Sequence, residues 1–431
     1  MLKLKRLTIE RYRNVLPGTE LRFDDGLNLI MGQNASGKTT LLELLSAVCR
    51  SAFDGIAHEE FVLDYEIRSE RFVVSAHVSH LRADSGDGGE IFGVGPRWVD
   101  AYEVAVDDRV AEAQLTIRSR GNAPHASSTF MDVGGSVVSS SIDLIMGWSF
   151  IAATLSTRGG DWAVLRSELI TTFAWTFRFD ESLGCFSAMT GRLASLVGTA
   201  AVPIARAGLI EERDALGRTS TTTGAFVPAV LARALHRSFQ SSTSSSKRVD
   251  LGGDERAMMV EFARMLGVED VSITPNLLEH RVTDSSRSFQ VEGFTFEITR
   301  ADGTVIHHDR LSYGQKRLLA FCYYLECNPF SVIADELVNG LHHRWIDASM
   351  AALKGRQAFL TSQNPLLFDY VEFDSIEQVR SSFITCTLEV VDGREQMVWR
   401  NMSEREAQIF FDAYEVGIEH VGDILITRGL W

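Results

Sequence analysis

The sequence predicts an α/β fold built around a P-loop nucleotide site whose two halves lie about three hundred residues apart. A glycine-rich loop stands between an apolar strand and a helix near residue 32, and a second apolar strand ends in paired carboxylates near residue 335. Hydrophobic residues make up 45% of the chain and charged residues 23%, which is typical of a globular protein. We therefore expect a chain that folds throughout.

The first elements are strands. Residues 2–4, 7–9 and 20–23 alternate between apolar and polar side chains, and Asp24, Asp25 and Gly26 form a turn signal. The short apolar run 27–31 is typical of a buried strand. After the loop, leucines and Val48 recur at helical spacing from Thr39 to Cys49. The predicted order is strand, loop, helix.

The loop from Gly32 to Thr39 reads GQNASGKT and matches GxxxxGK[ST] at every fixed position. Glycines let backbone N–H groups turn toward phosphate oxygens, and the helix N-terminus favours negative charge. Lys38 is expected to reach the β and γ phosphates of ATP, as a catalytic residue, and Thr39 to bind Mg²⁺ through its hydroxyl. The predicted nucleotide-binding residues of this segment are Gly32, Asn34, Ala35, Ser36, Gly37, Lys38, Thr39 and Thr40.

The second half of the site begins with the pentapeptide Leu311 to Gln315 and a helix over 316–326. Residues 331–334 then form a short apolar strand that ends at Asp335 and Glu336. In this arrangement we expect Asp335 to bind Mg²⁺ and Glu336 to polarise the attacking water as a catalytic residue.

The sequence predicts that the chain is divided into three parts. Residues 1–135 form the N-terminal part of the ATPase head, with an antiparallel lobe and a mobile Gly-rich loop over 84–95. Residues 136–285 form an insertion that reads mostly as helices, with polar linkers and no heptad pattern. Residues 286–431 complete the head, beginning with an alternating strand at 294–300 and a turn at Asp302 and Gly303.

The net charge indicates which partners the protein can bind, and the cysteines indicate the cellular compartment in which it works. With 42 basic and 57 acidic side chains the formal charge is −15, so any contact with nucleic acid must be local. Residues 1–50, with eight basic and five acidic side chains, are the one candidate patch, although a solvated strand face also explains them. The five cysteines lack zinc or CxxC spacing, which favours a cytoplasmic location.

The first fourteen residues lack the apolar core of a signal peptide, and the apolar stretch 142–155 is too short to span a bilayer and is predicted as a buried helix. No membrane association is expected. The histidine pairs at 307–308 and 342–343 lack the i, i+4 spacing and the third ligand of a zinc site, so Mg²⁺ is the only metal predicted.

Together these segments resemble the RecF, SMC and OLD-like branch of the ATP-binding cassette ATPases, in particular short AAA_21-type AAA family members without a coiled-coil arm. The segments that carry the resemblance are Ile9 to Asn14 as the opening strand and Arg-Asn turn, Gly32 to Thr40 as Walker A, Leu311 to Gln315 as the signature, Ile333 to Glu336 as Walker B, Asn339 to His342 as the D-loop and Thr361 to Pro365 as the switch segment. Residues from about 55 to 290 show no such resemblance.

The resemblance implies a P-loop NTPase of the cassette head type with a β-rich N-terminal lobe and an inserted helical subdomain. It implies a homodimer with ATP sandwiched between heads, or a higher oligomer, in which Ser312, Gly314 and Gln315 bind the nucleotide of the other subunit. It also implies that Arg13 approaches the nucleotide, although a plain surface arginine is equally consistent. No glutamine stands out for a Q-loop, and Gln114 is more simply an exposed strand residue.

The chain departs from the family in the switch segment. Gln363 occupies the usual place of a histidine and Asn364 that of a serine. Gln363 is predicted as a catalytic residue, but glutamine does not titrate near neutral pH, which implies slow turnover or a nucleotide sensor that does not hydrolyse. Leu337 and Val338 also replace residues common before the D-loop.

The resemblance implies an ATP-driven switch or motor that acts in antiviral defence with a separately encoded effector protein. The alternative is a RecF-like ATPase of DNA repair, which the net charge disfavours. A fused nuclease of the OLD kind is also disfavoured, because only 95 residues follow Glu336 and they contain no acidic DxD cluster.

Overall fold

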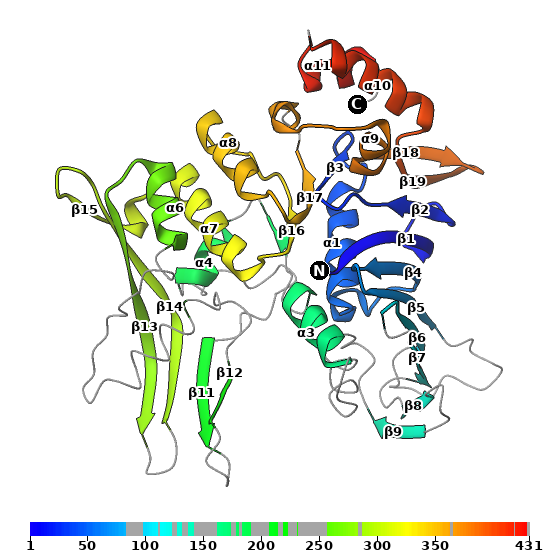
Figure 1. Ribbon diagram of the computed structural model, residues 1–431, viewed down its shortest axis with the longest axis horizontal. Helices are drawn as coiled ribbons and strands as arrows, with labels where there is room; N and C mark the ends of the chain where they lie inside the picture. Colours follow the sequence, from blue (N-terminus) through cyan, green and yellow to red (C-terminus); the bar gives the residue numbers. More distant parts are fainter. Residues whose placement is uncertain are drawn as a thin grey trace. The chain divides into compact units, whose positions relative to one another are not determined.

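The structure of the protein is a computed structural model. It describes residues 1–82, 98–110, 113–122, 127–131, 137–141, 162–173, 178–180, 183–190, 207–213, 219–222, 231, 257–282, 287–362, 365–417 and 419–428. The chain forms two compact units, and Figure 1 shows its elements. The first unit contains Met1–Arg178, Phe330–Asp335 and Gly355–Trp431, and the second contains Phe179–Pro329 and Glu336–Lys354.

An eight-stranded antiparallel sheet forms the lobe of the first unit, in the order β2-β1-β4-β5-β6-β7-β8-β9. Buried and less buried residues alternate along β4, as expected for strands with one face against a core. The bounds are β1 Lys3–Tyr12, β2 Thr19–Arg22, β4 Phe61–Arg68, β5 Phe72–Arg82, β6 Trp98–Asp108, β7 Ala113–Asn122, β8 Ser127–Met131 and β9 Val137–Ser141. The antiparallel lobe expected from the sequence is present.

A second sheet carries the P-loop and has the order β10-β16-β17-β3-β18-β19. Strands β16, β17, β3 and β18 are parallel neighbours, and β19 returns antiparallel to β18. The bounds are β3 Leu27–Met31, β10 Arg178–Phe179, β16 Ser331–Ala334, β17 Gln357–Thr361, β18 Phe383–Val391 and β19 Arg394–Asn401. Because β3 and β16 both run toward the same edge of this sheet, the loops that follow them meet there.

Helices of the first unit pack beside these sheets. Helix α1 buries four leucines and Val48, and α3 buries Leu165 and Leu169 in the same core. The bounds are α1 Lys38–Arg50, η1 Asp54–Ile56, α3 Trp162–Phe173, η5 Pro365–Tyr370, α9 Ile376–Ser382, α10 Glu404–Val416 and α11 Val421–Thr427. The predicted helix after the P-loop is thus confirmed to within one residue at each end.

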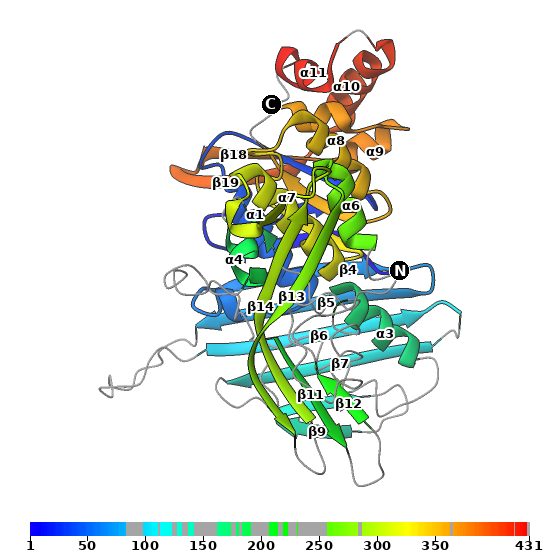
Figure 2. The same cartoon turned by 90° about the vertical axis from the view of Figure 1, so that its left-hand side faces the viewer.

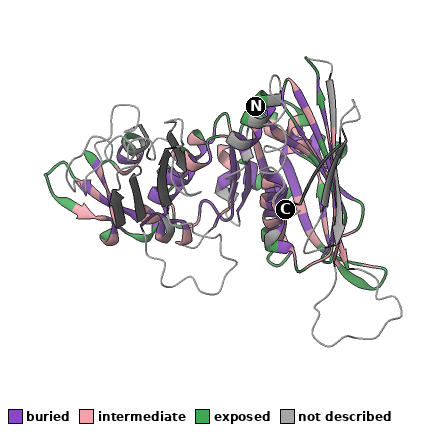
Figure 3. Ribbon diagram, turned by 90° about the horizontal axis from the view of Figure 1, so that it is seen from below, coloured by how far each residue is buried: buried purple, intermediate pink, exposed green. Residues whose placement is uncertain are grey.

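One buried side chain joins the two sheets of the first unit. The amide of Gln357, on β17, accepts from the Leu4 N–H at 2.9 Å and donates to the carbonyls of Leu4 and Asp24 at 2.8 Å each. Gln357 is 1% exposed, and Figure 3 colours such buried residues purple. Satisfied buried polar groups of this kind fix one arrangement of neighbouring elements.

The second unit is built on an antiparallel sheet of order β12-β11-β14-β13, whose strands Figure 2 labels, and β15 pairs with β14. The predicted hairpin at Asp302 and Gly303 is confirmed, because Gly303 has a φ of 79° between β14 and β15. The bounds are β11 Ala207–Arg213, β12 Thr219–Thr222, β13 Asp270–Val282, β14 Arg287–Thr299 and β15 Val305–His307.

The helices of the second unit pack on this sheet and on one another. Helix α7 contacts α4 and α6, and the Trp345 indole of α8 donates to the carbonyl of Met265 at 3.0 Å. The bounds are α4 Gly184–Thr190, α6 Ala257–Leu266, η4 His308–Arg310, α7 Tyr313–Cys327 and α8 His343–Ala352.

The expected helical character of residues 136–285 needs correction. The described part of this range contains three helices but also β9, β11, β12 and β13, so it is mixed. Strands β11 and β13 form because antiparallel pairing with β14 satisfies backbone groups that local propensity leaves undecided. The boundaries at residues 135 and 285 stay a prediction.

Two other expectations fall on residues that are not described: the Gly-rich loop 84–95 and the apolar stretch 142–155. None of the described helices combines the length and the apolar character that crossing a membrane requires.

Candidate functional site

The P-loop contains two glycines at positions where a side chain would be strained and would clash with neighbouring atoms. Gly32 and Gly37 have φ values of 148° and 89°, and Ala35 is left-handed at 65°. A Cβ at Gly32 would collide with the carbonyl oxygen of Cys386, and one at Gly37 would collide with the Met397 side chain. The β18–β19 hairpin therefore holds the loop from outside, and the glycines are needed for both conformation and space.

Lys38 lies at the first position of α1 and is 7% exposed. Its ammonium donates to the carbonyls of Gly32 at 2.8 Å and Gln33 at 2.9 Å, so it reaches back across the loop. Trp399 donates through its indole N–H to the Ser36 carbonyl at 3.4 Å. These contacts preorganise a concave loop at a helix N-terminus, which is an anion-binding arrangement.

Asp335 lies where β16 ends and gathers hydroxyl groups from two other segments. Its Oδ2 accepts from the Thr39 hydroxyl at 2.8 Å, and its Oδ1 accepts from the Thr361 hydroxyl at the end of β17. Arg178 approaches Oδ2 with Nη1 at 3.2 Å. The structure thus brings together Thr39 and Asp335, the two residues that the sequence assigns to Mg²⁺.

Glu336 is buried and has a left-handed backbone with a φ of 49°. Its carbonyl accepts from Arg317 of α7, which also donates to the carbonyls of Leu337 at 3.5 Å and Asp180 at 2.9 Å. Arg317 is 1% exposed and its guanidinium stands 5.1 Å from the centre of the Phe179 ring. Since a non-glycine residue in this region is strained, a buried arginine that binds the turn helps to maintain it.

Arg13 is also left-handed, with a φ of 46°, and its side chain contacts Glu59 and two residues of α1. It forms two hydrogen bonds with the Glu59 carboxylate at 2.7 and 2.9 Å. Its Nη1 lies 3.3 Å from Glu43 and 3.5 Å from the Thr40 hydroxyl. The hydrogen bond from Arg13 holds the pKa of Glu59 below its usual value. Arg13 and Thr40, both predicted to bind nucleotide, are therefore neighbours.

The signature residues and the D-loop interlock within the second unit. Ser312 caps α7: its hydroxyl accepts from the Gln315 N–H at 3.3 Å, and the Gln315 side chain accepts from the Ser312 N–H at 2.9 Å. A Cβ at Gly314 would lie 2.5 Å from the Gly340 carbonyl oxygen, and one at Gly340 would lie 2.7 Å from the Tyr313 ring. The two loops pack at a distance that only glycine permits.

Comparison with known proteins finds a match in the segment that contains the P-loop. The AAA_23 family, described as an AAA domain, matches residues 6–62. The DNA replication and repair protein RecF of Shewanella loihica is 50% identical over 44 residues, which are 10% of this chain and 12% of that protein. The N-terminal segment is thus similar to that of RecF. This chain therefore matches only a small part of the length of that relative.

Solved structures of RecF/SMC-like ATPases are similar at a distance. An SMC head bound to the C-winged helix domain of ScpA is 12% identical, with a TM-score of 0.42, over 93% of this chain and 98% of that one. RecF with ATP, from the RecFOR pathway, is 13% identical, with a TM-score of 0.34, over 92% of this chain and 97% of that one. Both likenesses are too distant to assign a substrate or a partner.

Three residues whose contacts are described above carry no motif in the sequence: Arg178, Arg317 and Trp399. Arg317 could have been noticed as a charge inside the apolar face of its helix, since the residues after it are buried. Arg178 and Trp399 give no such signal, because their partners lie 157 and 363 positions away.

The predicted catalytic residue Gln363 lies outside the described residues, as does Asn364. The side chain of Gln114 is likewise not described, although its backbone belongs to β7. Just before Gln363, Thr361 and Ser362 are buried at the end of β17. The role of Gln363 stays a prediction.

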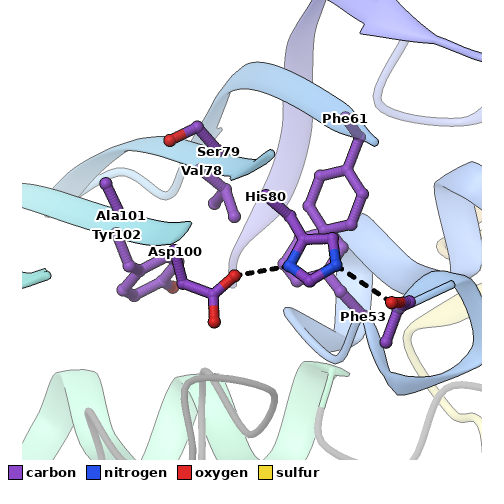
Figure 4. A pocket seen from close by; sticks show the side chains of 9 residues that line it. Phe53, Phe61, Val78, Ser79, His80, Asp100, Ala101 and Tyr102 are labelled. Carbon is purple, nitrogen blue, oxygen red and sulfur yellow. Dashed lines mark hydrogen bonds and ion pairs between the residues drawn. The ribbon is translucent and has the colours of Figure 1, made fainter. Parts of the chain in front are cut away.

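Two clusters away from the P-loop have structural explanations. In the cluster of His307, His308 and Asp309, the Nδ1 atoms of both rings accept backbone N–H groups at 3.3 and 3.0 Å. His80 stacks on Phe61 and contacts Asp100 and the Ala57 carbonyl through its two ring nitrogens, as Figure 4 shows. With their ring nitrogens engaged, these histidines stabilise turns and strands.

Proposed function

We propose that this chain binds Mg²⁺–ATP between its P-loop and Asp335 and hydrolyses the γ-phosphate. The hydrogen bond of 2.8 Å between Thr39 and Asp335 carries this proposal, because it joins residues 296 positions apart into an oxygen pair beside the loop. Mg²⁺ prefers oxygen ligands and commonly uses one or two from protein together with phosphates. A hydroxyl and a carboxylate therefore fit as its ligands.

The loop itself fits a phosphate. Positions Gly32 and Gly37 hold no side chain, and the buried Ser36 hydroxyl has no hydrogen-bond partner among the described residues. Lys38 can exchange its two carbonyl acceptors for phosphate oxygens without leaving the loop. Bound Mg²⁺ would offset charge on the β and γ phosphates. Glu336 polarises the attacking water, with Gln363 as the second residue proposed to position it.

We also propose that two copies share each nucleotide. Ser312 and the first N–H groups of α7 form an anion-binding helix terminus. The Ser312 hydroxyl accepts the capping bond, which leaves its own proton available to donate to a phosphate of another subunit. Gly314 and Gln315 keep this terminus in shape, Gly314 by close packing and Gln315 by capping.

Binding of ATP is tested by calorimetry with Lys38→Ala. We expect binding to be lost, because the phosphates lose their main cationic partner. Lys5→Ala is the matched control, since Lys5 pairs with Asp25 on the surface of the same unit. Unchanged affinity in the Lys38 variant would remove the P-loop from the proposed function.

Sharing of the site is tested by mixing Lys38→Ala with Ser312→Arg protein. Each variant alone should be inactive, while a mixed dimer keeps one intact pair of half-sites and should recover part of the ATPase activity. A Ser312→Arg protein that is fully active alone would contradict the shared site. Heterodimers, proven by mass, that remain inactive in every mixture would mean either that both sites must act together or that the signature acts within its own subunit.

The output is proposed to be an ATP-driven switch in the cytoplasm that controls a separate effector protein in antiviral defence. The formal charge of −15 supports a protein partner over a broad DNA track. Phage survival in cells that carry the parent or Glu336→Gln protein tests the defence role. Stimulation of ATPase activity by double-stranded DNA at physiological salt would favour the RecF-like alternative instead.

A further inference from the structure

Arg178 contacts the carboxylate that we propose as a Mg²⁺ ligand. Its Nη1 lies 3.2 Å from Oδ2 of Asp335, the same oxygen that accepts from Thr39. Its side chain is 25% exposed and that of Asp335 is 11% exposed, so the pair is largely shielded from water. Attraction between the two charges is therefore screened less than at an open surface.

A second carboxylate stands within reach of Arg178. Its Nη2 lies 4.0 Å from Oε1 of Glu43, which belongs to α1 and also pairs with Arg13 at 3.3 Å. The guanidinium thus lies between two anions, and a short movement of its long side chain exchanges one for the other. Two alternative acceptors for one guanidinium are what a two-state exchange would require.

Arg178 also directly precedes a segment bound by the signature helix. It is the last residue of the first unit before the chain enters the second, which begins with Phe179 and Asp180. Arg317 of α7 lies over the Phe179 ring and donates to the Asp180 carbonyl at 2.9 Å. Arg178 is therefore joined through one peptide bond to the segment that α7 binds.

Mg²⁺ bound by Asp335 would be a second cation beside the Arg178 guanidinium. Like charges at close range repel, which would disfavour joint occupancy of this carboxylate. We propose that Arg178 is an exchangeable counter-ion of Asp335, which Mg²⁺ displaces toward Glu43 as nucleotide binds, and that this exchange signals the bound state to α7. The inference rests on the proposed Mg²⁺–ATP site.

The test is a Mg²⁺ titration of the full chain in the presence of a fluorescent ATP analogue. Arg178→Gln should lower the Mg²⁺ concentration at half-maximal binding by about three-fold or more, because a competing ion pair is removed. Affinity for the analogue in EDTA should stay unchanged. Glu43→Gln should raise the midpoint, since the displaced guanidinium loses its second partner. Arg400→Gln, which breaks an ion pair with Glu406 away from Asp335, is the control and should not shift it.

Hydrogen exchange supplies the second readout. In the parent protein Mg²⁺ with the analogue should change exchange in α7, and Arg178→Gln should abolish this change while binding persists. An unshifted midpoint in Arg178→Gln overturns the inference. Weaker binding both with and without Mg²⁺ also overturns it, because Arg178 would then be a phosphate ligand. If Asp335→Asn keeps the parent's Mg²⁺ dependence, the Mg²⁺ site of the proposed function fails instead.

Discussion

The P-loop and the signature loop both depend on glycine, but for different physical reasons. Gly32 and Gly37 have positive φ and also lie against the β18–β19 hairpin, so both backbone conformation and space demand glycine. Gly314 lies inside helix α7 without a positive φ, and the nearest obstacle to a side chain is the Gly340 carbonyl oxygen, 2.5 Å from the place that a Cβ would take. The P-loop glycines are required by backbone conformation and by the hairpin, whereas Gly314 is required by the D-loop.

The two regions also differ in how charge is arranged. Around the P-loop, Asp335, Glu43 and Glu59 are shared among Arg13, Arg178 and two threonines. In the second unit the buried Arg317 binds backbone carbonyls instead. The first arrangement joins charged side chains to one another, whereas in the second a charged side chain binds neutral backbone groups.

The largest effect is expected at Glu336, which directly follows Asp335 at the end of β16 and precedes the D-loop. Glu336→Gln should keep ATP bound but reduce turnover by about two orders of magnitude or more, the usual scale for loss of a general base. Steady-state phosphate release and light scattering with ATP check this, and the trapped protein should be a dimer. Hydrolysis at the parent rate would place the base elsewhere, with Gln363 and His342 as the next candidates.

A substitution of Arg317 tests the contacts between its side chain and the backbone carbonyls of the second unit. Arg317→Met should reduce the free energy of unfolding by about 3 kcal/mol, because buried carbonyls lose a charged donor. If the residue also positions the Glu336 turn, kcat should fall while ATP affinity stays close to that of the parent. Urea unfolding and separate measurements of kcat and Kd check both parts. A drop in affinity with unchanged kcat would contradict a positioning role.

Gly314→Ala measures the packing of the signature loop against the D-loop. We expect destabilisation of about 1–3 kcal/mol from overpacking, with ATP still bound by the P-loop. Gly55→Ala is the control, because a Cβ there meets no atom within 4 Å. Thermal unfolding of both variants checks the difference, and equal stability would mean that the two loops separate without cost.

The smallest expected effect is on how the free energy of unfolding changes at acidic pH. The hydrogen bond from Arg13 lowers the pKa of Glu59 from 4.5, so the folded state binds this proton less readily than the unfolded chain. The stability that this pair contributes is present above about pH 4.5 and is lost as pH falls through the lower folded pKa. Arg13→Gln should flatten this part of the acid dependence in urea unfolding between about pH 7 and pH 3. An unchanged slope would remove Arg13 from the charged arrangement around α1.

Local patterns determined several elements correctly because their physical cause is local. The apolar run 27–31 is β3, the leucine periodicity after the loop is α1, and the turn residue Gly303 closes the hairpin between β14 and β15. The strands β11 and β13 escaped prediction, since their pairing with β14 depends on residues distant in sequence.

The sequence by itself determined which residues form the P-loop, where β16 ends in two carboxylates, and that the chain resembles RecF/SMC-like ATPases. It did so because a phosphate loop and a capped helix need particular residues at fixed spacing. Only the tertiary structure decided that Thr39 meets Asp335, that Arg178 stands between Asp335 and Glu43, and that Arg317 holds the turn at Glu336. These contacts join distant segments through the packing of sheets and helices, and no short pattern encodes them.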